Sequence, residues 1–232
     1  ENQNNTTLGN ARAGISGIGN YYGYFTTSFS ITYGRISNCD ITVSNESLVF
    51  DGTEKKPAVT VTCNGNTLTQ GQDYTLYYHA NTNAGSATVT ITGKGRFSGS
   101  VEKAFQIQPA DLSRSSVDLS ADSFTYDGTE KKPSVTVKTG NRQLTANSDY
   151  TVSFVNNTNA GSATVTVTGK GNYSGSVTKN FTISAASLEK AELALFASSF
   201  TYDGTEKKPD VTVTVNKKQL KKGTDYTVSY DN

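Results

Sequence analysis

The sequence predicts an all-β protein that is built from tandem copies of one small, two-layered unit. The heptapeptide DGTEKKP begins at Asp51, Asp127 and Asp203, which sets a repeat period of 76 residues. Apolar and polar residues alternate in short segments, as expected of strands with one buried face. Gly- and Asn-rich turns separate these segments, and such regular punctuation is typical of small β-domains.

The 76-residue period divides the chain into two complete repeats and two partial ones. The segment NNTTLGNARAGISGIGNYYGYFTTSFSI at the start of the chain aligns with NNTNAGSATVTVTGKGNYSGSVTKNFTI, which begins at Asn156. The first part of the chain therefore resembles the back of a repeat, and the last part resembles the front of one. We predict a C-terminal repeat part at 1–32, complete repeats at 33–108 and 109–184, and an N-terminal repeat part at 185–232.

Each complete repeat offers five or six short strands. In one of them Ala87, Val89 and Ile91 alternate with threonines, so that one face is apolar and the other is lined by hydroxyl groups. This pattern favours a small immunoglobulin-like β-sandwich, with the repeats arranged as a rod. A β-grasp-like repeat is the alternative, but it needs a helix across its sheet. The segment SLEKAELALF at 187–196 has the nearest approach to helical periodicity, and its alternating counterparts favour a strand there too.

The repeated heptapeptide predicts a turn. Asp-Gly after an aromatic residue is typical of a two-residue hairpin, because both central positions of a type I′ turn need positive φ. The chain is then expected to return as a strand that meets Pro133, which cannot donate a ladder hydrogen bond.

Charge and hydropathy limit the partners. The formal net charge is +1, which provides no basic field for nucleic acid. No apolar run approaches the roughly 18 residues that suggest a membrane-spanning helix, so we expect no membrane insertion in this segment. The sequence contains no methionine, and we expect a processed or excised segment of a longer chain.

No group of residues in the sequence predicts catalysis. His79 is the only histidine, and it is expected on the wet face of its strand without the partners of a triad or metal site. The segments GKGRFSG and GKGNYSG join two strands, whereas phosphate-binding loops lead from a strand into a helix. We therefore predict that the chain is not an enzyme and uses no cofactor.

Two pairs of residues are candidates for covalent crosslinks. Cys39 and Cys63 have inward parity within one repeat and are candidates for a disulfide, with two buried thiols as the alternative. Lys103 and Lys179 share parity with buried phenylalanines, so an intramolecular isopeptide bond to an Asn or Asp is a second hypothesis. A bulge or a lysine that reaches back to water explains the same parity.

The repeats resemble a known family. The aromatic-Asp-Gly phrase, the later DYTVSY strand and the AGSATVTVTGKGNYSG hairpin are similar to the YDG-type and related tandem repeats of bacterial extracellular proteins. This resemblance implies an adhesin-like protein at the bacterial cell surface. It does not identify a ligand, because such repeats serve as stalks as well as binding heads.

These observations predict a structural or adhesive tandem-repeat region that contacts neighbouring repeats and a host or matrix ligand. The aromatic turn residues Tyr126, Tyr202, Phe97 and Tyr173 are candidate contacts, with packing at the ends of the sandwich as the alternative. The alternative function is a self-assembling extracellular fibre. In that fibre, residues 1–32 of one chain complete residues 185–232 of the next.

Overall fold

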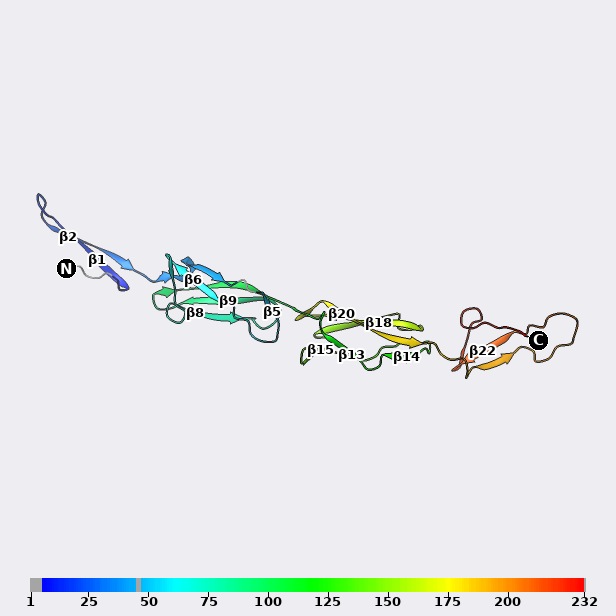
Figure 1. Cartoon of the computed structure of the whole chain (residues 1–232). Coiled ribbons are helices and arrows are strands. Elements are labelled where there is room, and N and C mark those ends of the chain that lie inside the picture. The colour runs from blue at the N-terminus through cyan, green and yellow to red at the C-terminus, as the bar shows by residue number, and fades with distance from the viewer. Residues whose placement is uncertain (1–5, 45–46, 232) are drawn as a thin grey trace. The chain divides into compact units, whose positions relative to one another are not determined.

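The computed structural model describes residues 6–44 and 47–231. Within these residues the chain forms β-strands and a single 3-10 turn at Ile36–Asn38, so the all-β prediction is confirmed (Figure 1). The ends of the predicted segments 1–32 and 185–232, namely residues 1–5 and 232, lie outside the described residues. A β-grasp repeat would need a long helix, and the described residues contain none.

The strands carry the labels of Figure 1. Their bounds are β1 Gly9–Ser16, β2 Tyr24–Ile31, β3 Gly34–Arg35, β4 Asp40–Val43, β5 Leu48–Val49, β6 Val59–Cys63, β7 Asn66–Thr67, β8 Tyr74–His79, β9 Gly85–Gly93, β10 Phe97–Ser98, β11 Ser100–Gln108, β12 Ala110–Asp111, β13 Ser116–Leu119, β14 Ser123–Thr125, β15 Val135–Thr139, β16 Arg142–Gln143, β17 Tyr150–Val155, β18 Gly161–Gly169, β19 Tyr173–Ser174, β20 Ser176–Ser184, β21 Glu192–Leu195, β22 Val211–Val215 and β23 Lys218–Gln219.

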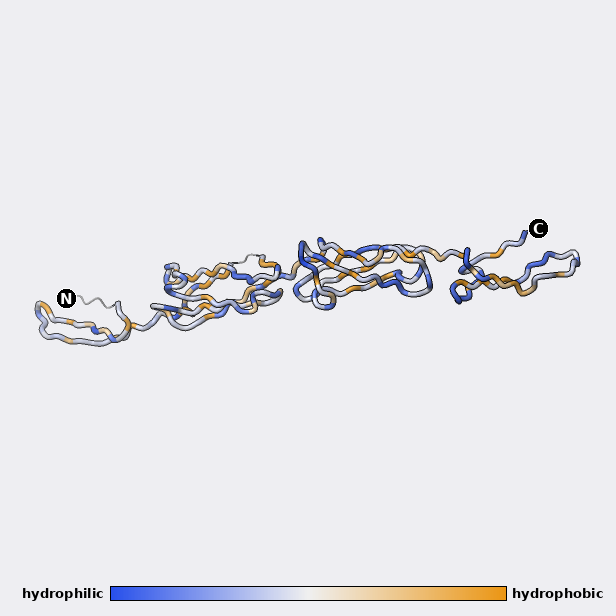
Figure 2. The backbone as a smooth tube through the Cα atoms, turned by 90° about the horizontal axis from the view of Figure 1, so that it is seen from below, coloured by the Kyte–Doolittle hydropathy of each residue, from blue (hydrophilic) through white to orange (hydrophobic). Residues whose placement is uncertain are grey.

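Corresponding strands recur at the sequence period. For example, β9 and β18 begin 76 residues apart, and β6, β15 and β22 do so in succession. In Figure 2 apolar stretches of the backbone tube, in orange, alternate with polar stretches in blue. The chain folds into two compact units, which comprise residues 1–116, 137–151 and 167–177, and residues 117–136, 152–166 and 178–232.

The first unit holds a hairpin and a sandwich. Strands β1 and β2 pair antiparallel and form a two-stranded sheet of their own. The sandwich has a four-stranded sheet with the order β5-β11-β9-β8 and a three-stranded sheet with the order β4-β6-β7. Val89 and Ile91 of β9, Ile107 of β11 and Val61 of β6 are fully or almost fully buried, so the alternating apolar faces of both sheets form the core.

The second unit repeats parts of this packing. Strand β14 pairs parallel with β20, and a core forms around Ala163, Phe181 and Ile183. Phe124 packs edge-on against Phe181, with 5.6 Å between the ring centroids. Strands β21, β22 and β23 form an antiparallel sheet. The segment with the nearest approach to helical periodicity thus contains a strand, at Glu192–Leu195.

Tyrosine hydroxyl groups join β8 to the opposite layer. Tyr78 donates a hydrogen bond to the carbonyl of Pro57 at 2.7 Å, and Tyr74 donates one to the carbonyl of Val59 at 3.3 Å. The hydroxyl of a tyrosine that is buried or half-buried needs a hydrogen-bond partner, and a backbone carbonyl supplies one in both cases.

A buried asparagine closes the loop after the heptapeptide. The side-chain amide of Asn81 donates a hydrogen bond to the carbonyl of Lys55 at 3.0 Å. The backbone carbonyl of Asn81 accepts the backbone N–H of Lys55 at 2.7 Å. Asn157 and Lys131 make the same two contacts at the same distances. Both asparagines are buried, so this paired contact fixes the backbone of each heptapeptide against the sandwich.

We predict that Asn157→Ala destabilises the second repeat by about 1–3 kcal/mol, because the carbonyl of Lys131 loses a buried hydrogen bond. Urea unfolding should show the loss, and the backbone N–H of Lys131 should exchange faster with deuterium. The control is Asn180→Ala, which removes only an exposed hydrogen bond to Thr164 and should change stability by less than about 0.5 kcal/mol. Equal effects of the two substitutions would contradict the role of Asn157.

Candidate functional site at the repeat junctions

Cys39 and Cys63 are joined by a disulfide, with 4.5 Å between their Cα atoms. The counterparts in the second repeat, Ser115 and Thr139, face each other across the same strand pair and share a hydrogen bond of 2.7 Å between their hydroxyl groups. The two positions therefore face each other in both repeats, and only in the first repeat are they joined by a covalent bond.

Lys103 and Lys179 are exposed on β11 and β20. Their exposure agrees with the alternative interpretation of the parity, a lysine side chain that reaches back to water. The parity with Phe105 and Phe181 does not bury them, because a long lysine side chain reaches water from the face of a small sandwich. Their exposure gives no support to an isopeptide bond, which needs a buried lysine beside its partner.

His79 is exposed at the end of β8, as expected, and its ring lies edge-on to Tyr77 at 4.4 Å. In the part of the chain that the structure describes, no group of three or more His, Cys, Asp or Glu side chains could hold a metal ion. Likewise, no helix there has the length and apolar character needed to cross a membrane.

The heptapeptide forms a different turn from the expected hairpin. Only the glycine of each Asp-Gly pair has a positive φ, and the strand before it pairs parallel with β11 or β20 instead of with the residues that follow. Asp127 accepts the backbone N–H of Thr129 at 2.8 Å and binds the Lys131 ammonium group at 2.5 Å. The aspartate thus organises the turn through its own side chain.

These contacts act on the acidity of the aspartates. In the third copy, the Lys207 ammonium group, followed by the hydroxyl and the backbone N–H of Thr205, lowers the pKa of Asp203 from 3.8 to about 2. The same contacts hold the pKa values of Asp51 and Asp127 well below the ordinary range. All three carboxylates stay ionised in mildly acidic solution, which keeps the turn intact there.

The first junction joins residues of the two complete repeats around the ring of Phe50. The Tyr173 ring packs edge-on against Phe50 with a centroid distance of 5.5 Å, and the Arg142 guanidinium lies 5.6 Å from the Phe50 centroid. As a result, Phe50 is only 6% exposed and Tyr173 only 5%. A cation over an aromatic face is attracted by the negative potential of the ring.

Polar contacts complete the first junction. The Asn172 side chain accepts the backbone N–H of Ala84 at 2.8 Å and donates its amide to the side-chain oxygen of Asn83 at 3.1 Å. Its backbone carbonyl accepts the N–H of Ala110 at 3.0 Å, and strands β12 and β19 pair parallel there. Asn172 and Tyr173 therefore pack against the end of the preceding repeat and cover it.

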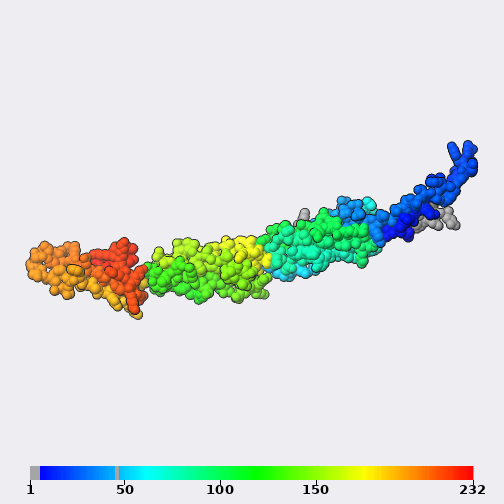
Figure 3. Space-filling view, turned by 180° about the vertical axis from the view of Figure 1, so that it is seen from behind, coloured from blue at the N-terminus to red at the C-terminus, as the bar shows by residue number. Residues whose placement is uncertain are grey.

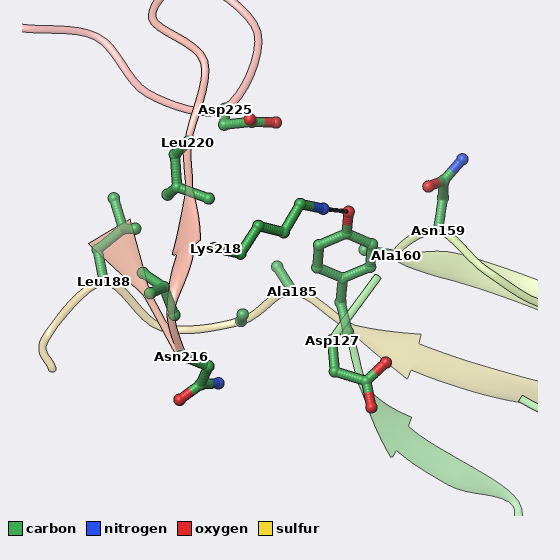
Figure 4. Close-up of a pocket in the computed structure, with 12 residues that line it drawn as sticks. Asp127, Asn159, Ala160, Ala185, Leu188, Asn216, Lys218, Leu220 and Asp225 are labelled. Carbon is green, nitrogen blue, oxygen red and sulfur yellow. Dashed lines mark hydrogen bonds between the residues drawn. The ribbon is translucent and has the colours of Figure 1, made fainter. Parts of the chain in front are cut away.

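The second junction has the same cation and aromatic positions. Lys218 lies 5.4 Å from the centroid of the Tyr126 ring and donates a hydrogen bond of 3.2 Å to its hydroxyl. Figure 4 shows Lys218 pointing from its strand toward the ring, with Asn159 and Ala160 beyond it. A cavity of about 500 Å³, lined also by Leu188 and Asp225, lies beside these residues.

The glycine of the heptapeptide makes room for the cation. A Cβ atom on Gly52 would lie 3.0 Å from a guanidinium nitrogen of Arg142, and one on Gly128 would lie 3.1 Å from the Lys218 ammonium. The φ values of these glycines, 85° and 83°, also lie where other residues are strained. The repeated phrase therefore serves the junction as well as its own turn.

The sequence-based candidates fall into two groups. Tyr173 is a buried packing residue and Tyr126 is half-buried under Lys218, as the packing alternative expected. Phe97 is half-buried, whereas Tyr202 is 92% exposed. Sequence reasoning missed Arg142, Lys218 and Phe50. The sequence contains a signal for these residues, because Phe50 and Tyr126 are 76 positions apart, and so are Arg142 and Lys218.

We predict that Lys207→Met raises the pKa of Asp203, because the Lys207 contact is the largest cause of the lowering. The folded-state pKa lies below the unfolded value near 3.8, so the contribution of this carboxylate to stability is present above pH 3.8. It is lost as the pH falls toward 2. A carbon-detected NMR titration of the carboxyl group measures the shift.

The matched control is Lys208→Met, which removes an equal charge from a lysine that pairs with Glu206. It should leave the Asp203 titration nearly unchanged. An equal shift in both variants would mean that general charge, and not the Lys207 contact, sets the pKa.

One part of the chain is similar to a known protein family. None of the curated proteins compared with the chain matches it. Residues 122–185, which span most of the second complete repeat, match the family model of the bacterial Ig-like domain (group 3). This part of the chain is therefore similar to bacterial Ig-like domains, and the similarity agrees with the two-sheet architecture.

Proposed function

We propose that the chain is a non-catalytic tandem-repeat region with a structural or adhesive role in a bacterial cell-surface or secreted protein. The recurrence of one junction, with Arg142 over Phe50 and Lys218 over Tyr126, carries the proposal. An arrangement that ties each repeat to its neighbour by the same contacts is typical of arrays whose stability comes from adjacent repeats.

The family match and the disulfide support an extracellular setting at the bacterial surface. The similarity of residues 122–185 to bacterial Ig-like domains supports an origin at the bacterial surface, and the Cys39–Cys63 bond fits an oxidising, extracellular compartment. The repeated YDG-type phrase supports an adhesin-like protein. In this proposal, the threonine-lined face of β9 and the exposed ring of Tyr202 are the surfaces offered to a host or matrix ligand.

A second candidate function is a self-assembling fibre, and the exposure of particular apolar residues favours it. Ile15 of β1 is 63% exposed, whereas its counterpart Ile91 is fully buried. Leu193 of β21 is likewise exposed, whereas its counterpart Val117 is buried. In Figure 3 the hairpin lies within the dark blue part of the chain. In a fibre, the hairpin of one chain would cover the β21-β22-β23 sheet of the next.

We predict that stretching single molecules of the chain produces discrete unfolding steps, because a load-bearing repeat unfolds as a unit. The disulfide encloses a loop with a sequence separation of 24 residues. At about 3.5 Å per residue, reduction should therefore lengthen the step of the first repeat by about 80 Å. Force spectroscopy with and without a reductant measures both effects.

The matched control is the double variant Cys39→Ser, Cys63→Ser, which should show the longer step without reductant. The step of the second repeat, where Ser115 and Thr139 replace the cysteines, should not change in either case. Smooth extension without steps would contradict a structural role. Steps that reductant leaves unchanged would contradict only the disulfide.

A further inference from the structure

The outer face of the four-stranded sheet in the first complete repeat carries an exposed pair of rings. Tyr77 and His79 lie on β8 at outward positions, and Tyr77 is 65% exposed. The two rings meet edge-on, with 4.4 Å between their centroids. This contact restricts the tyrosine ring, and most of the Tyr77 side chain stays open to water.

Strand pairing places polar groups in one row beside Tyr77. Tyr77 is paired with Thr90 on β9, and Thr90 is paired in turn with Glu102 on β11. Residues directly opposite each other share a face of the sheet, and adjacent strands lie about 4.8 Å apart, so the row is about 10 Å long. The Thr90 hydroxyl donates a long hydrogen bond of 3.5 Å to the exposed Glu102 carboxylate. A ligand hydroxyl could replace that weak contact.

Hydroxyl groups lie on both sides of this row. Thr75 pairs with Thr92 on one side, and His79 pairs with Thr88 on the other. Threonine is β-branched and stiff at χ1, so these hydroxyl groups are held in place before any ligand binds. A ligand that uses them therefore loses little side-chain entropy on binding.

The charge of this face limits the class of ligand. The outward positions of β8, β9 and β11 hold Thr, Ser, Ala, Gln, Tyr and His residues together with Glu102, and none of these positions holds Lys or Arg. A nucleic acid, a sulfated glycan or an anionic lipid surface needs a cluster of cations. A protein partner typically needs several aromatic or arginine anchors, and threonine is under-represented among such anchors.

A neutral carbohydrate suits both features of the face. The C–H bonds on one side of a sugar ring are attracted to the negative face of an aromatic ring. The hydroxyl groups of the sugar take up the hydrogen-bonding groups beside that ring, which orient the ligand. A row of this length is enough to span two linked sugar rings.

The second complete repeat forms the same sheet without the rings and the carboxylate. Its strand order β14-β20-β18-β17 corresponds to β5-β11-β9-β8. At the three equivalent positions it carries Ser153, Val155 and Thr178. The fold therefore does not require Tyr77, His79 or Glu102 at these positions.

We propose that the outer face of β8, β9 and β11 in the first complete repeat binds a neutral carbohydrate, with one sugar ring stacked on Tyr77. The Glu102 carboxylate accepts hydrogen bonds from the sugar hydroxyl groups, and the Thr90 hydroxyl bonds to the same sugar. His79 keeps the tyrosine ring in position. This inference rests on the adhesive role proposed above, for which it names the ligand class and the repeat that binds it.

The test is an NMR titration of the whole, isotope-labelled chain with neutral hexasaccharides of glucose, mannose, galactose or N-acetylglucosamine. At least one of them should bind and shift the resonances of Tyr77, Thr90 and Glu102. A heparin hexasaccharide, which is a polyanion, should leave these resonances unchanged, because the face lacks cations.

Substitutions taken from the second repeat test the site without a change of fold. Tyr77→Ser should weaken binding by at least about tenfold, because it removes the ring against which the sugar packs. The matched control is Tyr202→Ser, which removes a tyrosine that is 92% exposed elsewhere and should leave the affinity unchanged. Circular dichroism verifies that each variant is folded.

The reverse transfer asks whether the three side chains make the site. The triple variant Ser153→Tyr, Val155→His, Thr178→Glu, made in the Tyr77→Ser chain, should restore binding, with the shifts now on β17, β18 and β20. A triple variant that is folded and does not bind would overturn the assignment of the site to these side chains.

The outcomes separate the inference from the function on which it rests. A chain that binds none of the neutral hexasaccharides overturns the inference and leaves the structural tandem-repeat role in place. Binding that survives Tyr77→Ser, or that Tyr202→Ser abolishes, overturns the site and retains the adhesive role. Shifts at Tyr77 that follow heparin or the protein concentration would identify a polyanion or a second copy of the chain as the occupant, and would also overturn the inference.

Discussion

The fold depends on one constraint, which is that the apolar face of each short strand must be covered by a second layer. The residues at one equivalent position of three successive repeats show this constraint. Ile36 and Leu112 are fully buried in the complete repeats, whereas Leu188 is 46% exposed beside a three-stranded sheet. The sequence pattern is the same in each case, so burial is decided by what lies opposite. A small domain of this size has little apolar area to spare, which makes contacts between neighbours part of its stability.

The cross-strand pair at Cys39 and Cys63 shows that different kinds of side-chain contact can occupy the same position of the repeat. The second repeat places two hydroxyl groups there, and the third places Ala191 and Val215. A covalent bond, a hydrogen bond and an apolar pair thus occupy one position of the repeat. The backbone ladder sets the geometry, and the side chains adjust the stability of each repeat within it.

Much of the fold follows from the sequence, because alternation and period are local or strictly repeated signals. The strand faces around Val89 and the recurrence at 76 residues are examples. The Asp-Gly turn was misjudged because the strand before it pairs parallel with β11 or β20, a contact between distant segments that no local pattern encodes. For Lys103 the sequence left two interpretations open, since parity gives the face of a strand and not how far the opposite sheet extends.

The two junctions differ in a way that bears on which repeats can adjoin. Where the ring is Phe50, the cation is Arg142, whose flat guanidinium lies over a ring that offers no hydrogen-bond acceptor. Where the ring is Tyr126, the cation is Lys218, which bonds to the ring hydroxyl at 3.2 Å. The two substitutions compensate each other, because an ammonium group over phenylalanine would lose its hydrogen bond and retain only the attraction of the ring. In each of the two junctions, the ring is therefore paired with a cation whose contacts suit that ring.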